Sequence, residues 1–355
     1  MEQISLFGEK QKSTDWKWTM ANDYPEPNGL KVFSCFACGG GSTMGYKLAG
    51  CTVLGCVEID AKMNEVYIKN HHPKYNYLTD IREFNKIPNE ELPEELFHLD
   101  ILDGSPPCTT FSMAGQREES WGKKKKFREG QTEQTLDDLS FVFIETAKKL
   151  QPKVVIMENV EGLILGEAWT YVQRIYKEFD EAGYNLKHYL LKGEKMGIPQ
   201  TRHRVFFIAV RKDIPFDYDK LDMWFDYEPV PFKVIKDGEG SLINQDSLTY
   251  ERVCQANDSD KSIADTLERM GKKGSAFQTY YIRDDEVMPT IRSKNDIIDI
   301  KHKRWITKET LRNTQTFPQD YDFDGKNVGY ICGMSVPPVM IKRIMLRLID
   351  TGVFE

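Results

Sequence analysis

Short hydrophobic runs alternate with longer stretches of mixed polarity between about residue 30 and residue 210. The apolar runs, each typical of a buried strand, lie at 31–38, 52–59, 96–102, 153–157 and 205–210. Between them, hydrophobic residues recur at helical spacing, at 42–50, 60–71, 135–150 and 169–182. Strands that are apolar throughout are typical of a parallel sheet that helices cover on both faces. The pattern therefore predicts an α/β fold built from β-α-β units.

This alternation stops after Arg211, where the chain becomes rich in Asp, Tyr, Phe and Pro. We expect a separate, smaller domain at 213–303 and a C-terminal segment, 304–355, that returns to the main domain. Residues 1–28 are polar and end in a cluster of chain-breaking residues, so we expect them to form an N-terminal tail. The main domain is then expected at 29–212.

Composition excludes several classes of protein. The chain has 355 residues, of which 40% are hydrophobic and 29% are charged, as in ordinary globular proteins. A chain of this length can bury a full core without disulfides or a structural metal. It has no apolar run of about 18 residues, the length that a membrane span needs. The first residues also lack the apolar centre of a secretory signal.

Seven cysteines, an odd number without a secretory signal, favour a reducing compartment and hence the cytoplasm. The pairs Cys35–Cys38 and Cys51–Cys56 have a spacing that zinc sites can use. They lie in apolar and glycine-rich sequence, however, and unpaired cysteines are among the most buried residues of proteins. We therefore expect core packing rather than a metal site.

The formal net charge of −7 does not by itself indicate a nucleic-acid-binding protein. The charge is unevenly distributed, however, since 213–260 holds 12 acidic and 4 basic residues whereas 261–312 holds 12 basic and 8 acidic residues. A further basic run lies at 123–126. Local basic patches matter more for phosphate binding than the total charge.

The first predicted strand leads into a glycine-rich loop, Gly39-Gly40-Gly41, that precedes a helix. Glycines at such a turn let a ligand approach the backbone, and the helix N-terminus favours negative groups. Glu58, near the end of the second strand, is placed to bind ribose hydroxyls. The G-x-G-x-x-G spacing is absent, so a nicotinamide dinucleotide is not supported. Taken alone, a glycine turn with a solvated glutamate explains this pattern equally well.

Three further motifs follow predicted strands or precede one. Cys108 comes directly after Pro106-Pro107, at the edge of the sheet where α/β proteins bind ligands. Glu158 leaves a hydrophobic strand, and a carboxyl group in such surroundings can hold a proton. Arg202 and Arg204 lie two residues apart on an extended segment and so point to the same side. Taken alone, Cys108 could be an ordinary buried cysteine in a proline turn, and the charged residues could form surface ion pairs.

Together, and in this order, the motifs resemble the cytosine-C5 DNA methyltransferases. That resemblance implies a Rossmann-like sheet that binds S-adenosylmethionine, with the 213–303 domain recognising the target. The residues that carry the resemblance are Phe36 to Gly41, Pro106-Pro107-Cys108, Glu158-Asn159-Val160, Gln200-x-Arg202-x-Arg204, Arg283, Pro289-Thr290, Arg304 to Phe317-Pro318, and Gly333 to Pro338.

The resemblance also implies a mechanism. Cys108 matches the thiolate that adds to C6 of cytosine, a form of covalent catalysis that activates C5 for methylation. Glu158 matches the carboxyl that holds N3 and N4 of the base, and Arg204 matches the group that reaches O2, with Arg202 beside it. The target base has to leave the duplex first, because C6 cannot be reached inside the stack.

Further site residues are implied at matching positions, and they fall into two groups. Those implied to bind S-adenosylmethionine are Phe36, Gly40, Gly41, Glu58, Ile59, Asp80, Ile81, Pro107, Leu139 and Ser335. Those implied to contact DNA are Pro106, Thr109, Ser112, Lys123, Lys124, Lys125, Lys126, Arg128, Asn159, Val160, Arg283, Arg292 and Lys294.

Three positions depart from the pattern of the family. Cys38 replaces the first loop glycine, Thr109 replaces a glutamine after the nucleophile, and Met334 replaces an asparagine in the last motif. None of these changes Cys108 or Glu158, so we expect an active enzyme that methylates C5 of cytosine in a short duplex sequence, in a restriction-modification system or as an orphan or phage enzyme. Two alternatives stay open: an RNA cytosine methyltransferase, and a catalytically silent regulator that binds nucleic acid or cofactor.

Partners and location follow from the same resemblance. Double-stranded DNA is the expected partner, and we expect a monomer in the cytoplasm of a bacterial or phage-infected cell, associated with the nucleoid and not with a membrane. The segment Gln3-Ile4-Ser5-Leu6-Phe7 is similar to peptides that dock on bacterial sliding clamps. A disordered tail is the favoured explanation for these five residues.

Overall fold

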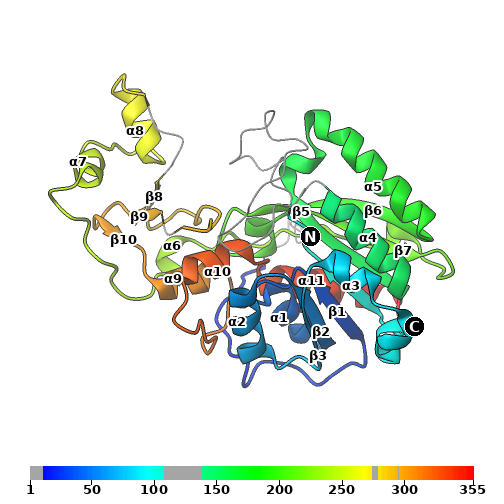
Figure 1. The fold of residues 1–355 in the computed structure, drawn as a ribbon. Coiled ribbons are helices and arrows are strands. Elements are labelled where there is room, and N and C mark those ends of the chain that lie inside the picture. The colour runs from blue at the N-terminus through cyan, green and yellow to red at the C-terminus, as the bar shows by residue number, and fades with distance from the viewer. Residues whose placement is uncertain (1–10, 108–137, 274–278, 295) are drawn as a thin grey trace, which may run out of the picture. The chain divides into compact units, whose positions relative to one another are not determined.

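The computed structural model describes residues 11–107, 138–273, 279–294 and 296–355, and the chain divides into two compact units. We call them the sheet unit (24–191, 203–223 and 341–355) and the small unit (1–23, 192–202 and 224–340). Figure 1 shows the labelled helices and strands of both units. The predicted clamp-binding segment Gln3–Phe7 lies outside the described residues. Among those residues, no helix combines the length and the apolar character that a bilayer crossing requires.

The sheet unit is built on one seven-stranded sheet with the order β3-β2-β1-β4-β5-β7-β6. Strands β1 to β5 are parallel where they pair, whereas β7 runs antiparallel to β5. The predicted α/β fold is confirmed, with a mixed rather than a purely parallel sheet. The strands are β1 (Lys31–Cys35), β2 (Thr52–Glu58), β3 (Tyr75–Leu78), β4 (Ile101–Gly104), β5 (Val154–Val160), β6 (Tyr184–Lys192) and β7 (His203–Arg211).

Helices connect these strands, and α2 and α3 each begin at an aspartate cap. Asp60 caps α2 by accepting hydrogen bonds from the backbone N–H groups of Lys62 and Met63. The helices are α1 (Gly41–Leu48), α2 (Ala61–His71), α3 (Ile81–Lys86), α4 (Leu139–Leu150), α5 (Trp169–Glu181) and α11 (Pro338–Asp350), with 3₁₀ turns at Asn89–Glu91, Glu94–Phe97, Glu161–Ile164, Gly166–Ala168 and Tyr218–Lys220.

Side chains alternate between the two faces of the sheet. Phe33, Leu102 and Val155 are level with one another on β1, β4 and β5, and they belong to one hydrophobic core with residues of α3, α4 and α5. Ser34 and Asp103 are the next level pair, and so they lie on the opposite face. This second face therefore carries a carboxyl group in the middle of a buried sheet.

The small unit contains a second, three-stranded sheet with the order β10-β9-β8. Its core joins Ile243, Val253, Ile263, Leu267, Tyr281 and Ile298. Its strands are β8 (Tyr280–Ile282), β9 (Ile297–Asp299) and β10 (Arg304–Trp305), and its helices are α6 (Phe232–Ile235), α7 (Leu248–Cys254), α8 (Ile263–Arg269), α9 (Lys308–Thr314) and α10 (Val328–Met334), with a 3₁₀ turn at Gly193–Met196.

This unit takes in more of the chain than the expected domain at 213–303. It continues to Met340 and includes residues that we expected to form an N-terminal tail. Trp18, one of them, is buried, and its indole Nε1 donates a hydrogen bond to the carbonyl oxygen of Thr316 at 2.8 Å.

Candidate active site

The glycine-rich loop of the sheet unit has a strained backbone. Phe36, Cys38 and Gly40 have φ values of 57°, 47° and 79°, all in the left-handed region. Only glycine takes that conformation without steric cost. At Gly40 space is also lacking, because a Cβ would lie 2.0 Å from Nε2 of His71. The loop thus requires glycine at position 40, and α1 begins at the next residue.

Glu58 holds this loop in place from the end of β2. Its side chain is buried, and its two carboxylate oxygens accept hydrogen bonds from the backbone N–H groups of Cys38 and Asp60, each at 2.8 Å. Glu58 therefore shapes the loop from the end of β2.

The other residues predicted to bind the cofactor lie in differing surroundings. Asp80 caps α3, accepts a hydrogen bond from the N–H of Arg82 at 2.8 Å, and pairs with its guanidinium. Ile59 is 38% exposed and can offer an apolar surface to a ligand. Ile81 and Leu139 are buried in the main core, which is an ordinary packing position.

An ion pair joins the ends of β5 and β7. The carboxylate of Glu158 lies 2.8 Å from Nε of Arg204, and both side chains are largely buried. Register explains the contact, because Arg204 is opposite Val160 and Phe206 is opposite Glu158. Residues two apart on a strand share a face, so Glu158 and Arg204 are diagonal neighbours. The structure thus brings together two of the predicted catalytic residues.

Asn159 links the end of β5 to the proline loop that follows β4. Its amide donates a hydrogen bond to the carbonyl oxygen of Pro106 at 3.3 Å and accepts one from the N–H of Val160 at 2.8 Å. Pro106 is buried and Pro107 is half-buried. The next residue would be the predicted nucleophile, but the predicted site residues Cys108, Thr109, Ser112, Lys123, Lys124, Lys125, Lys126 and Arg128 lie outside the described part of the chain.

The remaining predicted residues belong to the small unit. Arg202 is buried, and its guanidinium donates to the carbonyl oxygens of Ile291 and Gly333, each at 3.4 Å. These contacts support loops of the small unit, so within this unit Arg202 has a structural role that the sequence did not suggest. Ser335 is also buried, and its carbonyl accepts a hydrogen bond from the amide of Gln315 at 2.7 Å.

The arginines predicted to contact DNA are held by acidic or carbonyl groups within the small unit. Arg283 donates to the carbonyl oxygens of Asn257 and Asp260, at 2.8 and 3.0 Å. Arg292 pairs with the carboxylate of Asp296 and stacks over the ring of Tyr280. Both side chains therefore shape this unit, whatever else they contact.

Asp103 is a candidate functional residue that sequence reasoning missed. Its side chain is only 2% exposed, and it accepts hydrogen bonds from the hydroxyl groups of Ser34 and Tyr46, at 2.8 and 2.9 Å. The available signal was an aspartate inside an otherwise apolar run, because carboxylates are almost never fully buried unless they have partners.

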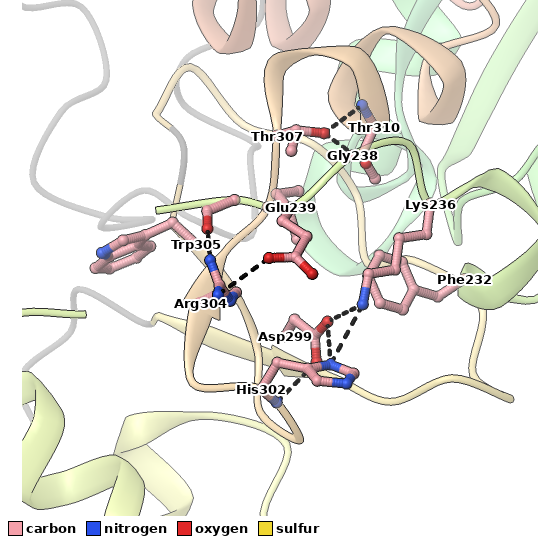
Figure 2. A pocket seen from close by; sticks show the side chains of 12 residues that line it. Phe232, Lys236, Gly238, Glu239, Asp299, His302, Arg304, Trp305, Thr307 and Thr310 are labelled. Atoms are coloured by element: carbon pink, nitrogen blue, oxygen red, sulfur yellow. Dashed lines mark hydrogen bonds and ion pairs between the residues drawn. The ribbon is translucent and has the colours of Figure 1, made fainter. Parts of the chain in front are cut away.

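A cavity of about 120 Å³ lies in the small unit, and none of the predicted site residues lines it (Figure 2). Its charged groups are paired with one another: Asp299 contacts Lys236 at 2.6 Å and His302 at 2.9 Å, and Arg304 lies 3.1 Å from Glu239. Because the charges are balanced inside the cavity, we do not place a cofactor there. Nor do the described residues contain a cluster of three His, Cys, Asp or Glu side chains suited to a metal ion.

Comparison with known proteins identifies the family of the chain. The profile of the family described as C-5 cytosine-specific DNA methylase matches residues 30–350. The type II methyltransferase M.FnuDI of Fusobacterium nucleatum is 35% identical over 185 residues, 52% of this chain and 48% of its own, so the chain spans about half the length of that relative. M1.HphI of Haemophilus parahaemolyticus is 27% identical over 339 residues, 89% of this chain and 85% of its own.

Solved structures share the fold over nearly the whole chain. A DNMT2 variant from Spodoptera frugiperda superposes with a TM-score of 0.64 at 16% identity, covering 90% of this chain and 100% of that one. A putative DNA modification methyltransferase from an Escherichia coli prophage gives a TM-score of 0.61 at 19% identity, covering 91% and 99%. At these identities the likeness establishes the fold alone. The family profile, which covers most of the sequence, establishes membership: the chain belongs to the C-5 cytosine-specific DNA methylase family.

Proposed function

We propose that the chain is a DNA (cytosine-5)-methyltransferase that transfers the methyl group of S-adenosylmethionine to cytosine in a short duplex sequence. The observation that carries the proposal is the Glu158–Arg204 pair at the end of β5, next to a proline loop that Asn159 holds. A carboxyl group and a guanidinium at one strand end can bind the N3–C2–O2 edge of a pyrimidine, because that edge offers a ring nitrogen and a carbonyl oxygen.

The proposed S-adenosylmethionine site lies in the sheet unit. Glu58 would accept hydrogen bonds from the ribose hydroxyls, and Ile59, which is exposed, would contact the adenine. The glycine loop at 36–40 would let the ligand approach the backbone, and the start of α1 would offer N–H groups to its carboxylate. Asp80 would accept from the adenine amino group.

The residues of the chain then have defined roles. Cys108, as thiolate, forms a bond to C6, while Glu158 holds N3 and Arg204 holds O2 as electron density moves toward C5. S-adenosylmethionine, when bound, would supply an electrophilic methyl group to C5 and leave as S-adenosylhomocysteine, with the electron pair of the broken S–CH3 bond on its sulfur. The C5 proton then passes to a base, the C6–sulfur bond breaks, and its electron pair returns to Cys108. Asn159 fixes the proline loop, and therefore the approach of the nucleophile.

Double-stranded DNA is the proposed partner, with the target cytosine turned out of the helix. Residues of the small unit would read base edges, while basic side chains bind phosphates. Relatives that are named type II or orphan methyltransferases suggest a role in a restriction-modification system or a phage. Action as a monomer on the nucleoid, and clamp binding through Gln3–Phe7, remain predictions.

The test compares wild type, Cys108→Ala and Glu158→Gln for incorporation of labelled methyl groups into duplex DNA and transfer RNA. We expect methylation of duplex DNA, no detectable turnover in Cys108→Ala, and a rate reduced by about 10²–10⁴-fold in Glu158→Gln, the usual contribution of a positioned acid or base. Undiminished activity of Cys108→Ala would rule out the covalent mechanism. If the protein methylates transfer RNA in preference to duplex DNA, its substrate is RNA and not DNA.

Duplex DNA with 5-fluorocytosine at the target position provides a second readout. Its fluorine cannot leave as a proton does, so the wild-type protein is expected to remain covalently attached and to migrate as a protein–DNA band in denaturing gels. Cys108→Ala is the matched control and should give no such band. A wild-type protein that binds S-adenosylmethionine but forms no adduct and no product would instead be a silent regulator.

A further inference from the structure

Asp103 lies at the centre of the sheet unit, on β4, with β1 on one side and β5 on the other. It is level with Ser34 on β1 and with Ile156 on β5, and it is 2% exposed. Burying a carboxylate is costly unless hydrogen-bond donors surround it. The presence of this carboxylate in a strand that is otherwise apolar and buried therefore needs an explanation.

The donors come from two other elements. The Ser34 hydroxyl on β1 and the Tyr46 hydroxyl on α1 each bind a different carboxylate oxygen of Asp103, at 2.8 and 2.9 Å. Ser42, the second residue of α1, adds a third side-chain hydrogen bond. The carboxylate thus joins β4 to β1 and to the first two turns of α1.

Both of the joined segments lead into the proposed active site. The helix α1 follows directly on the glycine loop at 36–40, which is the proposed binding site for S-adenosylmethionine. On the other side, β4 ends one residue after Asp103, and the chain continues through Pro106-Pro107 to Cys108. Gly104 packs so closely on Phe143 that a Cβ would lie 2.4 Å from its ring, which fixes the strand end as well.

We propose that Asp103 is a positioning residue for methyl transfer: its ionised carboxylate fixes the N-terminal turns of α1, and with them the glycine loop, relative to β4 and the proline loop that follows it. The proposal rests on the function proposed above, because it assumes that the glycine loop binds the methyl donor. Asp103 itself touches neither substrate nor donor in this scheme, and acts through Ser42, Tyr46 and Ser34.

Burial supports a pH-dependent role, because it raises the pKa of the Asp103 carboxyl to about 7, with the charge of Glu158 adding to the rise and the three hydroxyl groups opposing it. The other titratable groups close enough for their charges to interact with it are Tyr46 and Tyr67, together with Cys35 on the opposite face of the sheet, and burial raises the pKa values of all three well above their ordinary values. These three therefore stay neutral at pH 6–8, which leaves Asp103 to titrate beside Glu158.

The expected sign follows from which form the hydroxyl groups favour. Above about pH 7 the ionised carboxylate accepts from all three hydroxyl groups, whereas below it the protonated form has one acceptor fewer and the loop is held less firmly. Cofactor binding should therefore be tighter above pH 7. Stability should change in the opposite direction: because folding raises this pKa, the fold loses stability as the pH rises from about 4 to 7.

The experiment measures binding of S-adenosylhomocysteine by calorimetry from pH 5.5 to 8.5, together with KM for S-adenosylmethionine and kcat on duplex DNA. For Asp103→Asn we expect a KM about tenfold higher at pH 8, a kcat within about threefold of wild type, and loss of the pH dependence of binding near pH 7. Its melting temperature at pH 8 should equal or exceed that of wild type, which a residue with only a structural role would not give.

Two variants keep the carboxylate and remove one donor each. Tyr46→Phe and Ser34→Ala should move the midpoint of the binding profile to higher pH, because the absence of a donor disfavours the ionised form. Tyr67→Phe is the matched control: it removes a buried hydroxyl that contacts α1 through Thr43 at 2.9 Å, and the midpoint should stay in place.

Two results would overturn the proposal: an unchanged midpoint in both donor variants, or a wild-type KM and pH profile in Asp103→Asn. If Asp103→Asn fails to fold, the donor variants still decide the question. Failure of the proposed function looks different. In that case no variant methylates DNA, while the calorimetric profile still reports on Asp103.

Discussion

Cys38 shows how a single departure from a family pattern acquires a physical meaning. The family places glycine at this position, and here the residue has a φ of 47°, a left-handed conformation that costs a residue with a Cβ about 1–2 kcal/mol. Glu58 holds the strained residue in place by accepting a hydrogen bond from its N–H at 2.8 Å. The chain therefore maintains the loop geometry against its local preference.

Cys38→Gly should relieve this strain. The gain is partly offset by the greater flexibility of glycine in the unfolded chain, so we expect a net stabilisation of about 0.5 kcal/mol and a slightly higher midpoint in chemical denaturation. Cys38→Ala is the control, since it keeps the Cβ and removes the sulfur, and it should give no gain. Equal midpoints for the glycine and alanine variants would show that the backbone at this position is not strained in solution.

At the scale of elements, the hydrogen bond from Asn159 to Pro106 connects two strand ends that carry proposed catalytic groups. Asn159→Asp replaces a donor by a carboxylate that faces a carbonyl oxygen, so the two would repel. We expect kcat to fall about 10–100-fold, because small displacements of reacting groups have effects of this size.

Binding of S-adenosylhomocysteine to Asn159→Asp should change less than twofold, since the hydrogen bond lies at β5 and not at the glycine loop. Calorimetry and steady-state methylation on the same preparation check both statements. A loss of cofactor affinity equal to the loss of kcat would instead point to general unfolding of this edge.

Hydrophobic patterning predicted the interior strands of the sheet but not its two outermost strands. Residues 75–78 alternate between half-buried and exposed positions, and only two of the nine residues at 184–192 are buried, so neither forms the continuous apolar run that marks a central strand. The predicted strand at 96–102 begins only at Ile101, after a 3₁₀ turn. Orientation was also beyond prediction, because β7 is as buried as the parallel strands in the middle of the sheet, yet it runs antiparallel to β5.

The site was predictable to the extent that it depends on strand ends. Glu58 and Glu158 lie at the carboxyl ends of their strands and Arg204 lies near the start of the antiparallel β7, so their shared edge follows from the fold. The role of Asp103 was not predictable in the same way, because it depends on Tyr46 and Ser42, and the distance between a helix and a strand is set by packing. The hydrogen bonds of Arg202 to carbonyl groups of distant loops were hidden for the same reason.

At the scale of the whole molecule, the basic excess of 261–312 is less available to DNA than its count suggests. Many of its cations contact acids of the small unit: Lys301 lies 2.6 Å from Asp284, Arg269 lies 2.9 Å from Asp260, and Lys261 pairs with Glu286. Counting charges along the sequence ignores these ion pairs. A lysine or arginine can bind a phosphate only if breaking its ion pair within the protein costs little free energy.

The lysine run at 123–126 has no acidic residue within it, although it lies outside the described residues. Replacing Lys123, Lys124, Lys125 and Lys126 by glutamine should therefore weaken DNA binding more than replacing Lys261 and Lys301.

The salt dependence of binding tests this prediction. A plot of log affinity against log salt concentration has a negative slope, which becomes less steep by about 0.9 for each phosphate that the protein no longer neutralises. The slope of the quadruple variant should therefore be less steep by about 2–4 units. The Lys261→Gln/Lys301→Gln control should change the slope by less than about one unit, because its lysines neutralise Glu286 and Asp284. Fluorescence anisotropy with a labelled duplex between about 50 and 300 mM salt measures both slopes. If the control shows the larger change, the phosphate-binding side chains belong to the small unit and its ion pairs open when DNA binds.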